Sequence, residues 1–201
     1  MANKPKVLIA LLAQRLIFAR TTSSLVQAAM DKKDWEFDFY MEMGCDIASA
    51  RNRSVRVARE RGATHLMFVD YDMYFPPHSI TKLLKQDKDI IGASYNFRGN
   101  SGEPPKCTAV PITQEEMRHP HPDEIPKETF KCHCMGTGFM LIKMEVFDKF
   151  KGPWFMFGFT ETGELLYGED TFFAQRAIKE GGFDIWADPT LSVKHVGEQL
   201  F

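Results

Sequence analysis

The sequence predicts an α/β fold in which a mostly parallel central sheet is flanked by helices. Three short apolar runs have the length and continuity of strands that are buried on both faces. Segments with apolar residues at helical spacing separate these runs, so strand and helix alternate as a parallel sheet requires. A chain of 201 residues suits one domain, and we expect residues 1–201 to form a single one.

The chain begins with two strand and helix pairs. Lys6 to Leu12 is an apolar run headed by a charge, as is typical of a buried parallel strand, and Ser23 to Met30 follows with helical spacing. Phe37 to Met41 is the second predicted strand. Ile47 to Arg61 is the second predicted helix, which Gly62 ends in the usual C-terminal position.

The next two strands enclose a third helix. His65 to Asp70 is an apolar run that ends in an acid, and Asp89 to Tyr95 is the third such run. Between them, Pro76-Pro77 opens a helix with Ile80 and Leu83 on its apolar face. Ligands of such sheets bind beyond the carboxyl ends of the strands, which is where Asp70 lies.

The pattern changes between Asn96 and Phe130. This segment has prolines at positions 104, 105, 111, 120, 122 and 126 and little periodicity. We therefore expect residues 96–130 to form a loop or hairpin excursion within the domain, and excursions of this length are often functional.

Regular structure resumes after the excursion. The remaining predicted elements are a strand at Gly138 to Lys143, a short helix at Glu145 to Phe150, a helix at Thr171 to Glu180 that Gly181-Gly182 ends, and short strands around Ile185 and Val193. Neither an internal repeat nor a low-complexity segment interrupts this order.

Composition excludes several classes of protein. A net charge of -2 argues against a protein whose main task is gripping nucleic acid, because such affinity depends on neutralising phosphates. The arginines between positions 51 and 61 lie all round their predicted helix and form no basic stripe. The 4 cysteines do not read as a disulfide scaffold. No apolar run is long enough for a transmembrane segment, and we expect a cytoplasmic protein.

Two acids directly follow the strand at positions 65–70. In an extended chain, Asp70 and Asp72 would present their carboxylates on the same side. Mg²⁺ and Mn²⁺ prefer oxygen ligands and commonly share one or two carboxylates with substrate phosphates. The Asp70-Tyr71-Asp72 triplet is therefore a candidate metal site, and the alternative is a pair of solvated loop acids.

Five segments follow one another in an order known from glycosyltransferases. They are Ala48-Ser49-Ala50-Arg51-Asn52, His65 to Asp72, Cys134 to Leu141, Gly168-Glu169-Asp170, and Val193 to Gly197. On these motifs the chain resembles the nucleotide-sugar glycosyltransferases with the GT-A fold, particularly the family 2 group, over most of its length. The resemblance implies a single GT-A domain of Rossmann-like type.

The resemblance also implies a role for each matching residue. Asp70, Asp72 and His195 would hold Mn²⁺ or Mg²⁺, the implied metal cofactor. Asp170, preceded by Glu169, would take the proton from the acceptor hydroxyl if the enzyme inverts. The residues implied in binding the donor are Arg51, Asn52, Asp70, Tyr71, Gly136 and Gly138.

Each of these residues has a purely structural alternative. Asp170 could cap the following helix, the glycines could form a tight turn, and His195 could be a structural histidine. The aromatic stretch from Trp154 to Phe159 could be core or a platform for a sugar acceptor. Arg98, close after a predicted strand, is a weaker candidate for donor contacts.

The implied reaction moves a sugar from a nucleoside diphosphate sugar, UDP-sugar above all, to a hydroxyl of a carbohydrate or another acceptor. A nucleic acid remains an alternative acceptor, although the net charge of the chain does not support it. One departure is that residues 13–19 lack the acid with which many family 2 members bind the base. The alternatives are a non-catalytic carbohydrate- or nucleotide-binding module and a sugar nucleotidyltransferase, whose glycine-rich loop after the first strand is missing here.

Overall fold

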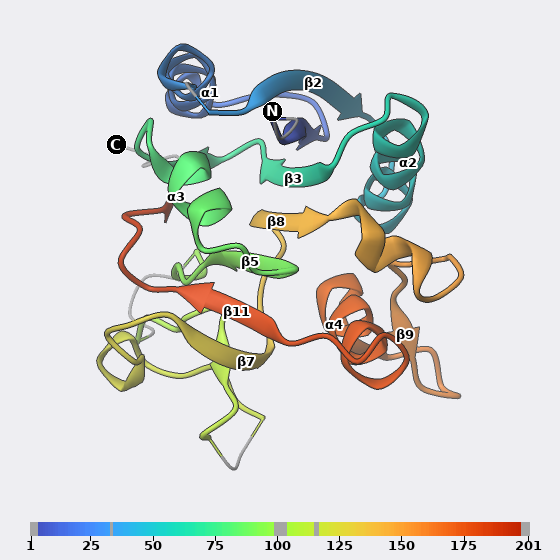
Figure 1. Cartoon of the computed structure of the whole chain (residues 1–201). Coiled ribbons are helices and arrows are strands. Elements are labelled where there is room, and N and C mark those ends of the chain that lie inside the picture. Colours follow the sequence, from blue (N-terminus) through green and yellow to red (C-terminus); the bar gives the residue numbers. More distant parts are fainter. Residues whose placement is uncertain (1–3, 33, 99–103, 115–116, 198–201) are drawn as a thin grey trace.

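An eight-stranded sheet in the order β2-β1-β3-β8-β5-β11-β7-β6 runs through the molecule (Figure 1). The computed structural model describes residues 4–32, 34–98, 104–114 and 117–197. The strands of the sheet are β1 Lys6–Ala13, β2 Glu36–Met43, β3 His65–Asp70, β5 Ile90–Ala93, β6 Val110–Pro111, β7 Phe130–Cys134, β8 Phe139–Lys143 and β11 Ile185–Asp188. The predicted α/β class with helices around a central sheet is confirmed.

The sheet is mixed. β1 is parallel to β2 and to β3, and β5 is parallel to β11. β8 lies between β3 and β5 and runs antiparallel to both, so it joins the two parallel parts. β7 and β6 extend the sheet by antiparallel pairing beyond β11.

Helices cover both faces of the sheet, as Figure 1 shows with α1 and α3 on one side and α2 and α4 on the other. They are α1 Ala19–Asp31, α2 Ile47–Glu60, α3 Ser79–Lys85 and α4 Glu169–Lys179. Residues Leu8 and Leu12 of β1 pack into the core below α2, while Val7 and Ile9 pack into the core below α1. β1 is continuously apolar because both of its faces are buried.

Short elements complete the chain. They are β4 Met73–Tyr74, the 3-10 turns η1 Pro122–Glu124 and η2 Met144–Asp148, the hairpin β9 Gly158–Phe159 and β10 Leu165–Tyr167, and β12 Lys194–His195. β12 pairs antiparallel with β4, which brings His195 opposite Met73. The excursion at 96–130 returns to the sheet, where β6 pairs with β7.

The element boundaries differ from the predicted ones in informative places. α1 begins four residues earlier than the predicted Ser23, and its polar residues Thr21 and Ser24 are buried. The predicted helix after Lys143 is the 3-10 turn η2. α4 begins at Glu169, before the predicted Thr171, so Asp170 lies inside its first turn.

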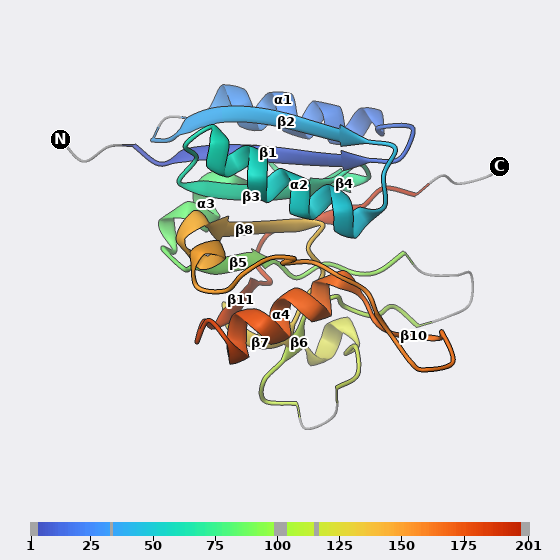
Figure 2. The same cartoon turned by 90° about the vertical axis from the view of Figure 1, so that its right-hand side faces the viewer.

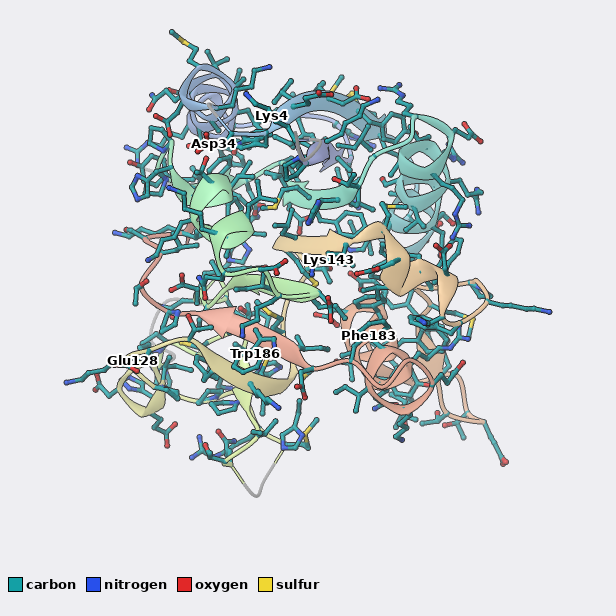
Figure 3. The ribbon with its side chains drawn as sticks, viewed as in Figure 1. Lys4, Asp34, Glu128, Lys143, Phe183 and Trp186 are labelled. Carbon is teal, nitrogen blue, oxygen red and sulfur yellow. The ribbon has the colours of Figure 1, made fainter. Side chains whose placement is uncertain are left out.

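The strands of the sheet end at two opposite sides of the molecule. β1 and β2 point toward the side where β4 and the β9–β10 hairpin lie (Figure 2). At the opposite edge, Lys4, Asp34 and Lys143 are labelled in Figure 3, and Lys143 forms ion pairs there with Asp87 and Asp89. Among the helices of the described ranges, none is long and apolar enough to cross a membrane.

Candidate functional site

A cleft of about 1310 Å³ opens where β1, β3 and β5 end. Its walls come from the β1–α1 loop, the turn after β3, the chain leaving β5 and the segment around β12. The described residues that line it are Gln14, Arg15, Leu16, Ile17, Phe18, Ala19, Tyr71, Ser94, Tyr95, Asn96, Phe97, Arg98, Val193, Lys194, His195 and Gly197. The cleft therefore occupies the edge at which α/β sheets bind ligands.

The charge of the cleft is one-sided. Arg15, Arg98 and Lys194 contribute cationic groups to its wall, and none of the described lining residues is an aspartate or a glutamate. Clefts lined by one sign of charge concentrate ligands of the opposite sign. The chain is acidic as a whole, with a net charge of -2, yet this cleft suits an anion.

Tyr71 and Phe18 form one wall. Their rings stack with centroids 6.0 Å apart. The backbone N–H of Phe18 donates to the carbonyl of Tyr71 at 3.1 Å, and the N–H of Tyr71 donates to the carbonyl of Leu12 at 3.0 Å. These bonds tie the β1–α1 loop to the end of β3, so both aromatic rings keep their place in the cleft.

Asp72 lies just behind this wall, in the turn between β3 and β4. Its side chain is only 6% exposed and forms an ion pair with the guanidinium of Arg98, whose side chain is 45% exposed. Arg98 also donates to the Tyr71 hydroxyl at 3.1 Å and lies over the Tyr71 ring. The chain turns after Asp70, so the two acids of the triplet have different neighbours, unlike the extended arrangement that the spacing predicts.

His195 lines the same cleft from β12. Its Nδ1 lies 2.7 Å from the carbonyl oxygen of Asn96, so Nδ1 carries the proton and Nε2 has a lone pair. The ring packs edge-on against Tyr95. Burial lowers the pKa of His195 below its ordinary value of 6.5, which favours the neutral imidazole.

Asp70 belongs to a buried network below the cleft. Its carboxylate, which is 23% exposed, pairs with the Arg51 guanidinium of α2 at 3.3 Å, and Arg51 is 3% exposed. The Nε of Arg51 lies 3.2 Å from Glu169 at the start of α4, and Nη1 donates to the carbonyl of Thr137 at 3.4 Å. Arg51 thus connects β3, α4 and the glycine-bearing segment.

Gly136 and Gly138 pack closely against the interior side of the site. A Cβ at Gly138 would lie 2.7 Å from the Tyr95 hydroxyl and 2.8 Å from Oδ2 of Asp70, and a Cβ at Gly136 would lie 2.8 Å from the same hydroxyl. The N–H of Gly138 donates to Tyr95 at 3.0 Å. Burial raises the pKa of Tyr95 far above its usual range, so Tyr95 is a neutral support.

Asp170 stands beside this network in the first turn of α4. Its Oδ1 accepts from the N–H of Thr171 at 2.7 Å. Burial, followed by the neighbouring charge of Glu169, raises the pKa of Asp170 above its ordinary value of 3.8. A part-buried carboxylate with a raised pKa beside a network of charged groups is an environment in which general bases are found.

Asn52 has a different task from the predicted donor contact. Its amide nitrogen donates to the carbonyls of Ala48 and Phe155 at 2.8 and 2.6 Å. Its amide oxygen accepts from the N–H groups of Trp154 and Phe155. Asn52 therefore anchors the loop before β9, whose Trp154 and Phe155 are core residues.

Two of the three predicted metal ligands, Asp72 and His195, have donor groups that suit a divalent cation, whereas the third, Asp70, is paired with Arg51. Asp72 offers a carboxylate, and His195 donates its Nδ1 proton to a backbone carbonyl, the arrangement that orients Nε2 of metal-ligating histidines. Within the described part of the chain, no three or more His, Cys, Asp or Glu side chains are grouped to hold a metal ion. A cation at Asp72 would have to displace the guanidinium of Arg98.

Sequence reasoning named some of the residues around the cleft and missed part of its lining. Of the predicted residues, Tyr71, Arg98 and His195 line the cleft, whereas the other predicted side chains are not among its described lining. Arg15 and Phe18 belong to no motif, and Lys194 lies in the Val193 to Gly197 segment but was assigned no role. The signal that could have found Arg15 and Phe18 is position, because both follow the first strand at its carboxyl end.

Comparison with known proteins supports the fold. No protein-family model and no curated protein matches the chain. The fold is similar to that of A197 from STIV, with a TM-score of 0.67 and 17% identity over 96% of this chain and 86% of that one. Two structures of HddC from Yersinia pseudotuberculosis, one complexed with GMP-PN, cover 72% and 74% of this chain and 80% of theirs. Their 10% identity and TM-scores of 0.35 carry no inference.

Proposed function

We propose that this chain is a metal-dependent glycosyltransferase that moves a sugar from a nucleoside diphosphate sugar to an acceptor hydroxyl. The observation that carries the proposal is the cationic cleft at the carboxyl ends of the strands, where the Asp70-Tyr71-Asp72 turn meets His195. The diphosphate of a sugar donor needs compensating positive charge, and its sugar needs a cavity next to the diphosphate. We propose a UDP-sugar as the donor and the cytoplasm as the location.

The donor would lie along the cleft wall. Phe18 and Tyr71 offer an aromatic wall for the base, and Arg98 and Lys194 offer charge for the phosphates. Asp72 and His195 would hold Mn²⁺ or Mg²⁺, which would neutralise the developing charge of the diphosphate leaving group. Arg51 would keep Asp70 and Glu169 in place below the donor.

Asp170 would accept the proton of the attacking hydroxyl. Its raised pKa makes its carboxylate a better proton acceptor than an ordinary aspartate. Glu169 would support it indirectly, because its carboxylate is held by Arg51. The acceptor, a carbohydrate or another hydroxyl compound, would approach over the β9–β10 hairpin, where Phe159 and Leu165 are exposed.

The experiment that tests this function is a thermal-shift screen against UDP, GDP, CDP, ADP and dTDP, each with Mn²⁺, with Mg²⁺ and with EDTA. One diphosphate at about 100 times its Kd should raise the Tm by about 5 to 10 °C in the presence of metal. Asp72→Asn should lose that shift. The matched control is Asp148→Asn, which removes an exposed carboxylate on η2 and should keep it.

Three results would redirect the assignment. Absence of a shift with every nucleotide would exclude a donor site in the cleft. A metal-dependent shift with neither sugar transfer to any acceptor nor hydrolysis of the donor would favour a nucleotide- or carbohydrate-binding module. Release of pyrophosphate from a nucleoside triphosphate and a sugar phosphate would identify a sugar nucleotidyltransferase instead.

A further inference from the structure

The two acids of the triplet are paired with arginines of opposite character. Asp70 is paired with Arg51, which is buried and also bound to Glu169 and to a backbone carbonyl. Asp72 is paired with Arg98, which lines the cleft and is half exposed. The first arginine has no way to leave without breaking the interior. The second one faces solvent and has a cleft to move into.

The burial of Asp72 requires a cation at this place. Removing a carboxylate from water costs several kcal/mol unless a positive charge compensates it. In this structure, the guanidinium of Arg98 supplies that charge. A divalent cation would supply it better, and two cations at one carboxylate would repel each other, so binding of the metal would release Arg98.

We propose that Arg98 is a ligand of the donor diphosphate that is held on Asp72 until a divalent cation takes its place. The inference rests on the proposed function and adds to it the residue that couples metal binding to donor binding. When the cation occupies Asp72, the guanidinium turns into the cleft and binds the phosphate oxygens. Tyr71 keeps it near, since Arg98 lies over the Tyr71 ring with 5.5 Å between guanidinium carbon and ring centroid.

Phosphate is the partner that the surroundings favour. The described lining of the cleft contains no acidic side chain that would capture the released guanidinium. Arginine presents a planar fork of donors that matches two oxygens of a phosphate. Lys194 of β12 lines the same cleft and adds a second positive charge for the same anion.

The test separates metal binding from nucleotide binding. Mn²⁺ affinity without nucleotide is measured by the EPR signal of free Mn²⁺, and UDP affinity in saturating Mn²⁺ is measured by calorimetry. Arg98→Gln keeps a neutral hydrogen-bonding group at Asp72, and Arg98→Met keeps only an apolar side chain there. Two different replacements are used so that at least one variant folds. Circular dichroism checks the fold of each, and Arg56→Gln on α2 is the control for the loss of one positive charge.

Both replacements of Arg98 should bind Mn²⁺ about tenfold more tightly than the wild type, because the competitor for Asp72 is gone. They should also bind UDP about tenfold more weakly, because a phosphate ligand is gone. Arg56→Gln should change neither value. Opposite shifts of the two affinities are a signature that a merely structural arginine would not produce.

Two failures overturn the inference, and they differ from failure of the proposed function. Equal Mn²⁺ affinity in the wild type and both variants would show that Arg98 does not compete with the metal. Equal UDP affinity would show that Arg98 does not bind the diphosphate. Each result leaves the glycosyltransferase proposal standing as long as the wild type binds UDP with Mn²⁺. If the wild type binds no nucleoside diphosphate at all, both proposals fall together.

Discussion

Asp70 and Asp72 are two residues apart, yet they belong to two regions of the molecule with different properties. Asp70 faces an interior network in which Arg51 connects α2, β3 and α4. Asp72 faces a cleft side made of Arg98, Tyr71 and the strand that carries His195. The interior network is suited to holding Asp70 and Glu169 in fixed positions. The cleft side is suited to exchanging the cation that is bound to Asp72. A candidate catalytic centre needs both, and here the turn after β3 separates them.

The strongest expected effect concerns Asp170, which stands next to the interior network. Its pKa is raised in the folded protein, so its contribution to stability is present below the ordinary value of 3.8 and is lost as pH rises through the raised value. Catalysis needs the ionised form, so kcat/KM should fall as pH drops through that raised pKa, with an acid limb above 3.8. Asp170→Asn should lower transfer by about 10²- to 10⁴-fold while UDP binding stays unchanged.

Undiminished transfer by Asp170→Asn would remove Asp170 as the base. The proposed general base would then have to be sought away from the interior network around Arg51.

The next largest effect is expected from breaking the interior network at its centre. Arg51→Met would leave Asp70 and Glu169 without their buried counter-charge, which should cost about 3–5 kcal/mol of unfolding free energy. Urea denaturation measures this loss. Arg56→Met on the exposed side of the same helix should stay within about 0.5 kcal/mol of the wild type. Equal stability of the two variants would contradict the structural task given to Arg51.

A smaller effect is expected where the glycine-bearing segment contacts the same network. Gly138→Ala places a methyl group 2.7 Å from the Tyr95 hydroxyl and 2.8 Å from the Asp70 carboxylate, so one of them must move. The cost should be about 1–3 kcal/mol. Gly197→Ala is the matched control, because a Cβ there would meet no atom of the described residues within 4 Å. A stable Gly138→Ala with unchanged donor binding would show that this close packing is dispensable.

The smallest effect on stability is expected from the cleft side. Arg98→Gln should lower the unfolding free energy by about 1–2 kcal/mol, less than Arg51→Met, because only one buried acid loses its counter-charge and the glutamine amide can still donate to it. Measuring the unfolding free energy of Arg98→Gln and Arg51→Met in the same urea assay compares the two arginines directly. A loss as large as that of Arg51→Met would mean that both arginines are structural.

Much of the fold could be predicted from local patterns. The apolar runs at β1, β3 and β5 and the helical spacing of α2 gave the α/β class, and Gly62 does end α2 with a φ of 64°. These predictions succeeded because burial on both faces leaves a mark in the sequence itself. The pairing of β8 between β3 and β5 left no such mark, because an apolar strand reads the same in either direction.

The candidate site was predictable in its residues more than in their roles. Asp70, Arg51 and Glu169 do lie together, although 118 positions separate Arg51 from Glu169. The resemblance implied that Asn52 binds the donor, and in the structure its amide holds the backbone of Trp154 and Phe155. A short sequence motif does not record which way an amide on a helix points.

The sequence by itself determined where strands, helices and chemically reactive side chains occur, because hydrophobic period and residue type are local properties. Only the tertiary structure decided which cation each acid meets. The turn at Tyr71 and Asp72 and the pairing of β4 with β12 bring Asp72 to Arg98, while the packing of α2 and α4 places Arg51 and Glu169 beside Asp70. Such partnerships depend on long-range contacts between elements, and those contacts arise only when the whole chain is folded.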